Sequence, residues 1–386
     1  MINDFFIDYL KHFIPVDFNI IHENEVKKIG NGEPKFNLHI NNFPSKQELL
    51  TSTSLALGEA YMRGDIDVEE DLYEVLDLFL GCMGKFTTDK GKLKKLIFTS
   101  SSKKNQKLEV QSHYDIGNDF YKLWLDSSMT YSCAYFKKDD DTLEQAQINK
   151  VEHILDKLHL EEGMSLLDIG CGWGFLLIQA AKKYKIHGTG ITLSKEQYEL
   201  CLQRIKEEHL EDYLTVKIMD YRDLKKSGFT FDRVVSVGML EHVGRDKYDS
   251  FLDNVNSVLK DGGLFLLHYI SALREHPGDA WIKKYIFPGG TVPSLREIIQ
   301  IMPDYNFYTL DVESLRRHYN RTLLYWRKNF LKHREEIEKT KGTEFTRMWE
   351  LYLSACAATF NNGIIDLHQI LMSKGVNNKL PMTRIV

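Results

Sequence analysis

The stretch LLDIGCGWG, residues 166–174, combines one carboxylate with three glycines at alternate positions. The glycines are Gly170, Gly172 and Gly174, and Asp168 stands two residues before the first of them. Glycine lets a backbone turn tightly and approach a ligand closely, and the N-terminus of a following helix favours a polar ligand. A carboxylate just before the loop suits an ammonium group or a ribose hydroxyl better than a pyrophosphate. We interpret the stretch as a loop for S-adenosylmethionine, with a purely structural tight turn as the alternative.

Polar residues after the next two predicted strands extend this interpretation. Doubly wound nucleotide-binding sheets commonly end the second strand in Asp or Glu, but here it is followed by Thr192, Leu193 and Ser194. Contacts to the ribose would come from Thr192 and Gln197, although Gln197 also stands where it can complete a capping box begun by Ser194. The residues in the expected place of an adenine, after the third strand, are Asp220, Tyr221 and Arg222. Surface charge is an equally simple reason for Arg222.

The elements around the loop alternate between strand-like and helix-like patterns beyond Gln111. Thr142 and Gln145 have the spacing of a capping box, and a helical apolar pattern follows to Leu158. The predicted strands are 165–169, 186–191, 214–218, 231–238 and 263–270, with helices from about 173, 194 and 246. Apolar strands joined by helical crossovers predict a doubly wound α/β fold, with a parallel sheet covered on both faces.

Residues 1–84 form a predicted smaller domain of mixed α+β structure. It begins with a helix, has a strand pair around the turn in 29–40, and continues with helices over 45–62 and 69–80. Residues 85–110 are rich in Lys and Ser, which indicates a linker or a basic surface segment. A solvated connector is one interpretation. The other is attraction to anionic lipid, worth about 1 kcal/mol for each Lys close to a membrane surface.

The bulk composition excludes several classes of protein. A length of 386 residues favours two domains, and 43% hydrophobic with 27% charged residues is typical of a globular protein. A net charge of −5 argues against a general nucleic-acid binder.

The five cysteines form no CxxC pair, so we expect no disulfide framework, no metal site and a cytoplasmic location. Asp4 and Asp8 argue against a signal peptide, and no stretch approaches the ~20 apolar residues of a spanning helix. A lipid substrate would be reached from the membrane surface.

Nine segments carry a resemblance to a known family. They are QSHYDIGNDFYKLWLD (111–126), YSCAYF (131–136), LLDIGCGWG (166–174), GITLSKEQ (190–197), DYRDL (220–224), VVSVGMLEHVG (234–244), LLHYI (266–270), WIKKYIFPGG (281–290) and HYNRTLLYWRKNF (318–330). Together they resemble the cyclopropane-fatty-acyl-phospholipid synthases, over nearly all of 111–386 and in the expected order. The glycine loop is shared by many methyltransferases, whereas YSCAYF, GMLEHVG and YIFPGG are much more specific.

The resemblance implies a Rossmann-like class I methyltransferase domain over 111–386. It implies transfer of the methyl of S-adenosylmethionine to the cis double bond of an unsaturated phospholipid acyl chain, with S-adenosylhomocysteine as product. Loss of a proton from the transferred carbon then closes a cyclopropane ring, and a bound bicarbonate is the implied proton acceptor. The bicarbonate ligands of the family match Cys133, Glu241, His268, Ile270 (through its backbone) and Tyr319. The cofactor contacts match Tyr131, Ser132, Gly170, Gly172, Thr192, Leu193, Gln197, Asp220, Tyr221 and Gly238.

The chemistry itself requires an apolar site, because an alkene is a weak nucleophile and water would trap the cation. Aromatic faces favour nearby positive charge, and plausible lining residues are Tyr131, Tyr135, Phe136, Tyr269, Trp281, Tyr285 and Phe287, of which core packing explains at least half. The insertion 274–294 mixes apolar residues with Lys283 and Lys284. It fits a lid that touches acyl chain and anionic headgroup, and a plain surface loop is the alternative.

Cys133 is expected to border the anion pocket and not to act as a nucleophile, because methyl transfer needs no covalent enzyme intermediate. The expected partners are a phospholipid bilayer at the inner face of the cell membrane and a second copy of the chain. The 1–84 domain would serve lipid association or dimer contacts. Two rival interpretations are a methyltransferase that acts on an amine, or on an olefin without ring closure, and a non-catalytic lipid-binding protein. The intact glycine loop and the set of Cys133, Glu241, His268 and Tyr319 argue against them.

Overall fold

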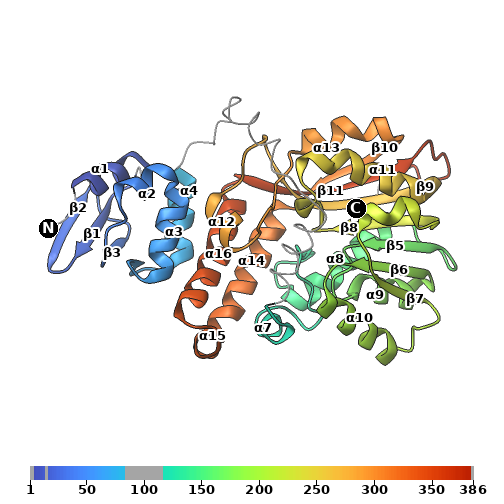
Figure 1. Cartoon of the computed structure of the whole chain (residues 1–386), viewed down its shortest axis with the longest axis horizontal. Coiled ribbons are helices and arrows are strands. Elements are labelled where there is room, and N and C mark those ends of the chain that lie inside the picture. The colour runs from blue at the N-terminus through green and yellow to red at the C-terminus, as the bar shows by residue number, and fades with distance from the viewer. Residues whose placement is uncertain (1–3, 14–15, 83–115, 384–386) are drawn as a thin grey trace. The chain divides into compact units, whose positions relative to one another are not determined.

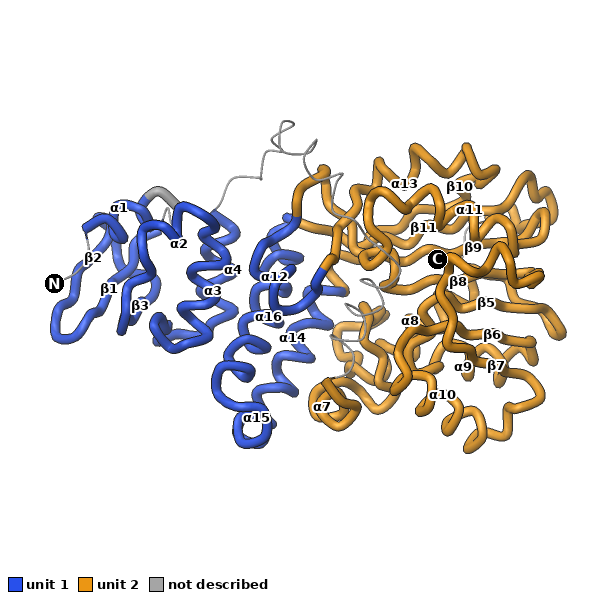
Figure 2. Tube along the Cα trace, viewed as in Figure 1, with its two compact units in different colours: residues 1–87, 278–288, 319–364 blue, residues 88–277, 289–318, 365–386 orange. Residues whose placement is uncertain are grey.

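The computed structural model describes residues 4–13, 16–82 and 116–383 (Figure 1). The chain divides into two compact units (Figure 2). Unit 1 comprises residues 1–87, 278–288 and 319–364, and unit 2 comprises 88–277, 289–318 and 365–386. Most of the insertion predicted as a lid therefore groups with the N-terminal segment, and so does the stretch that contains Tyr319. The predicted linker, 85–110, lies outside the described residues.

Unit 2 is built on one seven-stranded sheet in the order β10-β11-β9-β8-β5-β6-β7. Its strands are β5 (Ser165–Ile169), β6 (His187–Thr192), β7 (Leu214–Ile218), β8 (Phe231–Val237), β9 (Leu259–Ala272), β10 (Phe307–Ser314) and β11 (Ile365–Lys374). The ladders from β7 across to β9 are parallel, and β11 runs antiparallel to both of its neighbours. The five predicted strands are confirmed. The sequence interpretation missed β10 and β11.

Helices cover both faces of this sheet (Figure 1). The helices of unit 2 are α7 (Asn118–Lys122), α8 (Leu143–Lys157), α9 (Phe175–Tyr184), α10 (Lys195–Glu207), α11 (Tyr248–Val258) and α13 (Leu295–Ile301), with short 3-10 turns η1 (Tyr221–Lys226), η2 (Leu240–His242), η3 (Arg245–Lys247) and η4 (Met302–Tyr305). Thr142 caps α8 by accepting a hydrogen bond from the N–H of Gln145. The predicted capping box is only half formed, because the Gln145 side chain donates to Asn149 instead.

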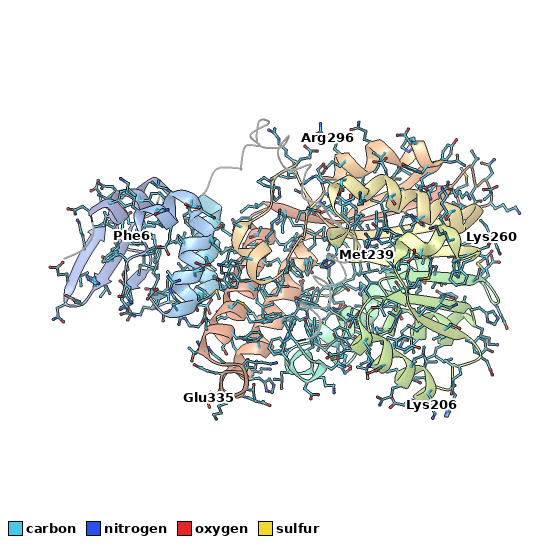
Figure 3. All side chains as sticks on the ribbon, in the orientation of Figure 1. Phe6, Lys206, Met239, Lys260, Arg296 and Glu335 are labelled. Atoms are coloured by element: carbon cyan, nitrogen blue, oxygen red, sulfur yellow. The ribbon has the colours of Figure 1, made fainter. Side chains whose placement is uncertain are left out.

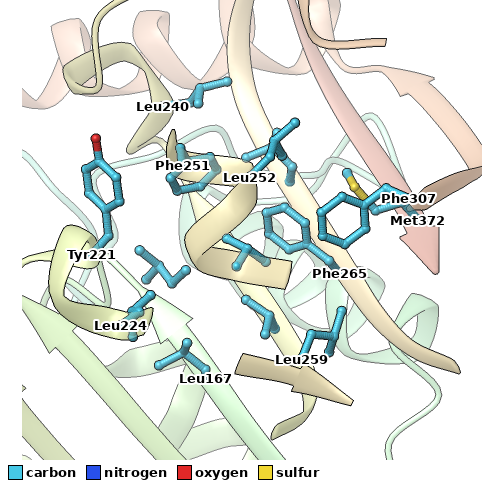
Figure 4. Close-up of a cluster of buried hydrophobic side chains, with 14 of the residues drawn as sticks. Leu167, Tyr221, Leu224, Leu240, Phe251, Leu252, Leu259, Phe265, Phe307 and Met372 are labelled. Atoms are coloured by element: carbon cyan, nitrogen blue, oxygen red, sulfur yellow. The ribbon is translucent and has the colours of Figure 1, made fainter. Parts of the chain in front are cut away.

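Alternate residues of each central strand enter different cores. Leu167 packs in the cluster that includes α11, which Figure 4 shows, whereas Leu166 packs with α8, α9 and α10. On β9, Phe265 belongs to the first cluster and Leu266 to the second. Side chains of a strand alternate between faces, so His268 points to the same face as Leu266, toward α8. Burying each large apolar side chain contributes about 1.5–3 kcal/mol, which fixes this register strongly.

Unit 1 contains a small four-stranded sheet in the order β2-β1-β3-β4. Its strands are β1 (Phe18–His22), β2 (Glu25–Ile29), β3 (Asn37–Ile40) and β4 (Ile66–Val68). The predicted pairing across 29–40 is wrong, because β1 lies between β2 and β3. The two-residue turn after His22, with Glu23 at φ 52°, closes a tighter hairpin of β1 with β2.

The helices of unit 1 are α1 (Asp4–Phe13), α2 (Lys46–Thr51), α3 (Thr53–Arg63), α4 (Leu72–Cys82), α12 (Ala280–Tyr285), α14 (Arg316–Lys332), α15 (Arg334–Lys341) and α16 (Thr343–Asn361), of which α14 begins just before the unit boundary. Phe6, labelled in Figure 3, is fully buried in the core beside the small sheet. The predicted 45–62 helix breaks at Ser52, which caps α3. No helix among the described residues is long and apolar enough to cross a bilayer.

Candidate active site

A cavity lies at the carboxyl ends of β5, β6 and β8, where ligands of open α/β sheets bind. The segment 128–132 and α8 supply its other walls. The predicted cofactor residues that line it are Tyr131, Ser132, Asp168, Gly170, Gly172, Thr192, Leu193, Gln197, Asp220, Tyr221 and Gly238. Met239, labelled in Figure 3, also belongs to the lining. Gly174 does not.

Gly172 and Gly174 of the loop must be glycine for different structural reasons. Gly172 has φ +54°, and a Cβ added there would meet no atom within 4 Å, which leaves its backbone free to approach a ligand in the cavity. Gly174 has φ +84°, and a Cβ there would lie 2.2 Å from Sγ of Cys201. Gly174 therefore allows the start of α9 to pack closely on α10, which gives it a structural role. Its contact with the cofactor stays a prediction.

Strand β6 ends at Thr192, whose side-chain hydroxyl forms a hydrogen bond within the protein. Thr192 Oγ1 donates to Oε1 of Gln197 over 2.8 Å, and Ser194 Oγ accepts from the N–H of Gln197 over 3.3 Å. The Gln197 side chain thus turns toward Thr192 and does not complete a capping box with Ser194. After the third strand, both carboxylate oxygens of Asp220 accept from Arg222, over 2.9 and 2.6 Å. Arg222 therefore neutralises Asp220 at the cavity wall.

Two buried ionisable residues, Asp168 and Lys150, line this cavity, and the charge of each affects the pKa of the other. Burial raises the pKa of Asp168 to about 7, and the charge of Lys150 opposes this shift. No described residue forms a hydrogen bond with Asp168 Oδ1. Burial lowers the pKa of Lys150 to about 8, and its Nζ donates to Ser132 Oγ over 3.0 Å. An unpartnered carboxylate oxygen is suited to a ligand ammonium or hydroxyl.

The sequence interpretation missed Lys150 and His242, both of which line the cavity. Lys150 stands four residues from Ala146 and four from Ile154, both fully buried apolar residues of α8. A lysine in the middle of an apolar stripe is the signal that could have marked it. Burial lowers the pKa of His242 to about 4, so this ring is neutral.

An aromatic cluster borders the cavity through Tyr131 and Trp173. The ring of Tyr131 lies 5.6 Å from that of Tyr121 and 5.3 Å from that of Trp124, and Trp173 lies 5.5 Å from Tyr121. The face of an aromatic ring attracts a cation such as a sulfonium. The cluster gives the cavity one wall suited to a positively charged, partly apolar ligand.

Glu241 lies in η2, just after β8, and is anchored to β9. Its Oε1 accepts from the backbone N–H of Ile270 over 2.6 Å, and its buried Oε2 has no hydrogen-bond partner among the described residues. Burial raises the pKa of Glu241 to about 7, although the hydrogen bond from Ile270 opposes this shift. The N–H of Ile270 is engaged by Glu241, so this backbone group supports the carboxylate. Glu241 can exist as a neutral carboxyl near neutral pH.

His268 lies inside β9, level with Val237, the last residue of β8, because β9 continues beyond its neighbour. Its carbonyl accepts from the N–H of Gly238 over 2.8 Å. Burial lowers the pKa of His268 well below its usual range, and the charges of Lys150 and Lys157 add to this effect. The ring is therefore neutral. Nδ1 contacts Gln369, whereas the buried Nε2 has no hydrogen-bond partner in the part of the chain that the structure describes.

Cys133 and Tyr319 come from different units. Cys133 is fully buried in unit 2, and its thiol donates to the carbonyl of Ala134 over 3.3 Å and contacts that of Leu315 at 3.9 Å. Tyr319 belongs to unit 1, where its ring lies 4.6 Å from that of Phe360. Unit 2 thus brings Cys133, Glu241, His268 and Ile270 into one domain. That these four residues and Tyr319 hold one anion stays a prediction.

The insertion supplies aromatic residues to unit 1. Trp281 is buried against α3, where a Cβ on Gly58 would lie 2.4 Å from its ring, and its Nε1 donates to Met62 Sδ over 3.2 Å. Glu59 of α3 accepts from Lys284 over 2.5 Å and from Tyr285 over 2.8 Å. Part of the insertion is the ordered helix α12, so it is not simply a surface loop.

Among the other aromatic residues predicted to line a channel, Tyr269 lies in the core of unit 2 and Tyr135 stacks between His153 and His318. Phe136 lies beside His318, with their ring centroids 6.3 Å apart. In unit 1, Phe287 packs edge-on against Tyr352. Core or local packing accounts for several members of that set.

Comparisons with known proteins cover both parts of the chain. The family model described as mycolic acid cyclopropane synthetase matches residues 101–370, and that of a domain of unknown function matches residues 5–91. The chain is 38% identical to the cyclopropane-fatty-acyl-phospholipid synthase of Escherichia coli (strain K12), over 92% of each chain. It is 39% identical to the probable fatty acid methyltransferase of Pseudomonas putida, over 85% of each. A solved structure of the mycolic acid cyclopropane synthase CmaA1, complexed with SAH and CTAB, is 35% identical, with a TM-score of 0.66 over 69% of this chain and 98% of that one.

Proposed function

Because this chain belongs to the mycolic acid cyclopropane synthetase family, we propose that it adds the methyl carbon of S-adenosylmethionine to the cis double bond of an unsaturated phospholipid and closes a cyclopropane ring. Unit 2 has the Rossmann-like fold of class I methyltransferases. The observation that carries the proposal is that unit 2 holds both the cofactor-type cavity and two buried groups, Glu241 Oε2 and His268 Nε2, that have no hydrogen-bond partner among the described residues. Gly238, which lines the cavity, donates its N–H to the His268 carbonyl.

The residues of the cavity fit S-adenosylmethionine, whose sulfonium supplies an electrophilic methyl group. The unpartnered Asp168 Oδ1 suits the ammonium or a ribose hydroxyl, and Gly172 leaves its backbone open to the ligand. The rings of Tyr131 and Trp173 present an aromatic wall that favours the sulfonium charge. Together these groups would hold the methyl group in place and keep water away from it.

The unpartnered pair also fits a small oxyanion. His268 Nε2 of a neutral ring and a protonated Glu241 carboxyl can each donate a hydrogen bond, and both groups are excluded from water. A raised Glu241 pKa allows a neutral carboxyl beside an anion. A bicarbonate held here would supply the oxygen that takes the proton from the transferred carbon. As the family resemblance implies, Glu241, His268, Cys133 and Tyr319 would hold it, and the Ile270 backbone would contribute through its hydrogen bond to Glu241.

The test is incubation of the full-length protein with S-adenosylmethionine and vesicles of unsaturated phospholipid. We expect each reacted acyl chain to gain one CH2 and the olefin signal to disappear, with S-adenosylhomocysteine formed in equal amount. A product that carries a branched methyl group would contradict ring closure. Persistence of the double bond with methylation of an amine would overturn the proposal.

The place of action follows from the substrate. We propose that the enzyme works as a homodimer at the inner face of the cell membrane, reaching phospholipids from the surface of the bilayer. Membrane attraction that depends on basic residues weakens as salt rises, because the screening length falls to about 8 Å at physiological ionic strength. Vesicle sedimentation at increasing salt, with and without anionic lipid, checks this proposal.

A further inference from the structure

We propose that Gln369 is a positioning residue that holds His268 with its proton on Nε2. His268 then donates a hydrogen bond to the proton-accepting anion and does not itself remove the proton. This inference rests on the proposed function for its catalytic meaning, whereas the state of the ring is a property of the protein alone.

The register of the sheet brings the two side chains together. In the antiparallel pair of β9 with β11, His268 lies directly opposite Gln369. Directly opposed residues project to the same face of a sheet, with Cβ atoms about 4.5–5.5 Å apart. Both side chains are buried, with Gln369 at 0% and His268 at 1% exposure, so water cannot replace either as a hydrogen-bond partner.

The orientation of the Gln369 amide follows from a third group. Lys157 Nζ donates to Gln369 Oε1 over 2.9 Å, and an ammonium can only donate. The amide nitrogen must therefore be the atom that faces His268, and Gln369 Nε2 lies 3.1 Å from His268 Nδ1. A rotated amide would place its NH2 group against the ammonium. The hydrogen bond to Lys157 excludes that orientation.

The tautomer of His268 follows from the amide. An amide nitrogen donates and never accepts, so Nδ1 must be the accepting, unprotonated nitrogen of the ring. In a neutral imidazole the proton is then on Nε2. That atom is buried and has no partner among residues 4–13, 16–82 and 116–383, so within this part of the chain it is a donor available to a ligand. A ring in this state cannot accept a proton at the free position.

Lys157 is itself held in place. Its Nζ donates to Glu313 Oε2 over 2.6 Å and lies 3.4 Å from Asp311 Oδ2 on β10. His153 contacts the same Glu313 oxygen at 2.7 Å. Despite burial, the hydrogen bonds from His153 and Lys157 hold the pKa of Glu313 at about 2, so it stays ionised. A fixed chain of contacts therefore runs from β10 through Lys157 and Gln369 to His268.

The titratable groups that act on His268 are Lys150, His153 and Lys157 of α8 and Glu313 of β10. The two lysines disfavour a charged ring, and Glu313 favours it. Wild-type protein should therefore show no ionisation of His268 across the neutral range. A carboxylate in place of the Gln369 amide would reverse this preference and would also require a proton on Nδ1.

The first test reads the ring directly in the full-length protein without lipid. Nitrogen NMR of histidine-labelled protein distinguishes a protonated ring nitrogen from an unprotonated one, and a His268→Gln sample assigns the signal. We expect Nε2–H in the wild type and Nδ1–H, with a raised pKa, in Gln369→Glu. A wild-type ring that carries its proton on Nδ1, or both protons, would overturn the inference whether or not the protein makes cyclopropanes.

The second test reads turnover. Gln369→Glu should lower kcat about tenfold or more and introduce a new ionisation in the pH profile, with unchanged affinity for S-adenosylhomocysteine. Ser373→Ala is the matched control, because Ser373 is also buried on β11 but bonds to Gly375. If Gln369→Glu does not fold, Gln369→Met is used in its place, because a methionine side chain cannot donate a hydrogen bond to His268. A Gln369 variant with wild-type kcat and pH profile refutes the assignment. A wild type that makes no cyclopropane refutes the proposed function alone, since the NMR result still decides the tautomer.

Discussion

The Glu241 carboxylate has one oxygen tied to β9 and the other left without a partner. Oε1 accepts from the Ile270 N–H over 2.6 Å, whereas the buried Oε2 forms no hydrogen bond with any residue of 4–13, 16–82 or 116–383. An unsatisfied buried carboxylate oxygen costs free energy, and the cost is larger for the ionised form. The contribution of Glu241 to the free energy of unfolding can therefore be measured by replacing its carboxylate.

Glu241→Gln should stabilise the protein at alkaline pH. The pKa of Glu241 is raised from 4.5 to about 7, so ionisation opposes folding progressively as pH rises from 4.5 through 7. Below pH 4.5 the group is protonated in both states and adds no such cost. Urea unfolding at pH 5 and pH 8 should therefore show the variant gaining up to about 3 kcal/mol relative to wild type between the two. An equal difference at both pH values would contradict a raised pKa.

The same substitution should nearly abolish turnover, as should His268→Ala. Both residues are proposed to hold the proton-accepting anion and neither lines the cofactor cavity. Calorimetric affinity for S-adenosylhomocysteine should remain close to wild type. Loss of cofactor affinity together with activity would assign the two residues a structural role.

Cofactor affinity should rise with pH between about 6 and 8. Asp168 has a raised pKa of about 7, so its carboxylate becomes fully available above that value, while Lys150 begins to lose its proton near 8. Asp168→Asn should remove the rise and weaken binding at pH 8 by about tenfold or more. Asp212→Asn, at an exposed position, is the control. A rise that persists in Asp168→Asn would assign the ionisation to another group.

Two glycine substitutions should separate stability from binding. Gly174→Ala places a Cβ 2.2 Å from Cys201 Sγ at a positive φ, so it should lower the unfolding free energy by more than the ~1–2 kcal/mol of backbone strain. Adding Cys201→Ala should recover part of the loss in a double-mutant cycle. Gly172→Ala should cost little beyond backbone strain but weaken cofactor binding, because its Cβ projects into open space. Additive effects of the Gly174 and Cys201 changes would argue against the clash.

Cys133→Ser should slow turnover several-fold without abolishing it. Serine keeps a donor for the Ala134 carbonyl, but its shorter bond changes the shape of a fully buried site. Steady-state rates with saturating cofactor measure the effect. Complete loss of activity in a folded variant would indicate that the thiol takes part in the chemistry.

The central strands and the glycine loop could be predicted from local pattern alone. Strands such as 165–169 and 214–218 are continuous β-prone runs bounded by helical periodicity, and their bounds agree with the structure. β10 and β11 were missed because they are separated by residues 315–364, and their pairing is antiparallel. Local periodicity does not reveal a partner so distant in sequence.

The contacts around the site were harder to predict for a similar reason. Gln369, Lys157 and Glu313 come from β11, α8 and β10, and only the register of the finished sheet brings them together. The resemblance pointed to His268 but carried no information about its support. Lys150 is the exception, because its place on the apolar stripe of α8 is visible in the sequence.

The insertion of β11 between β9 and β10 has a consequence for the newly made chain. During synthesis, β9 and β10 emerge from the ribosome well before residues 365–374. The edge of β9 that pairs with β11 in the finished sheet therefore lacks that partner until β11 is made. An open strand edge can pair with other chains, which makes this interval prone to aggregation. Until β11 enters, His268 lacks the neighbour that fixes its proton. His268, which we propose to contact the proton-accepting anion, would therefore reach its final hydrogen-bonded state only after residues 365–374 are made.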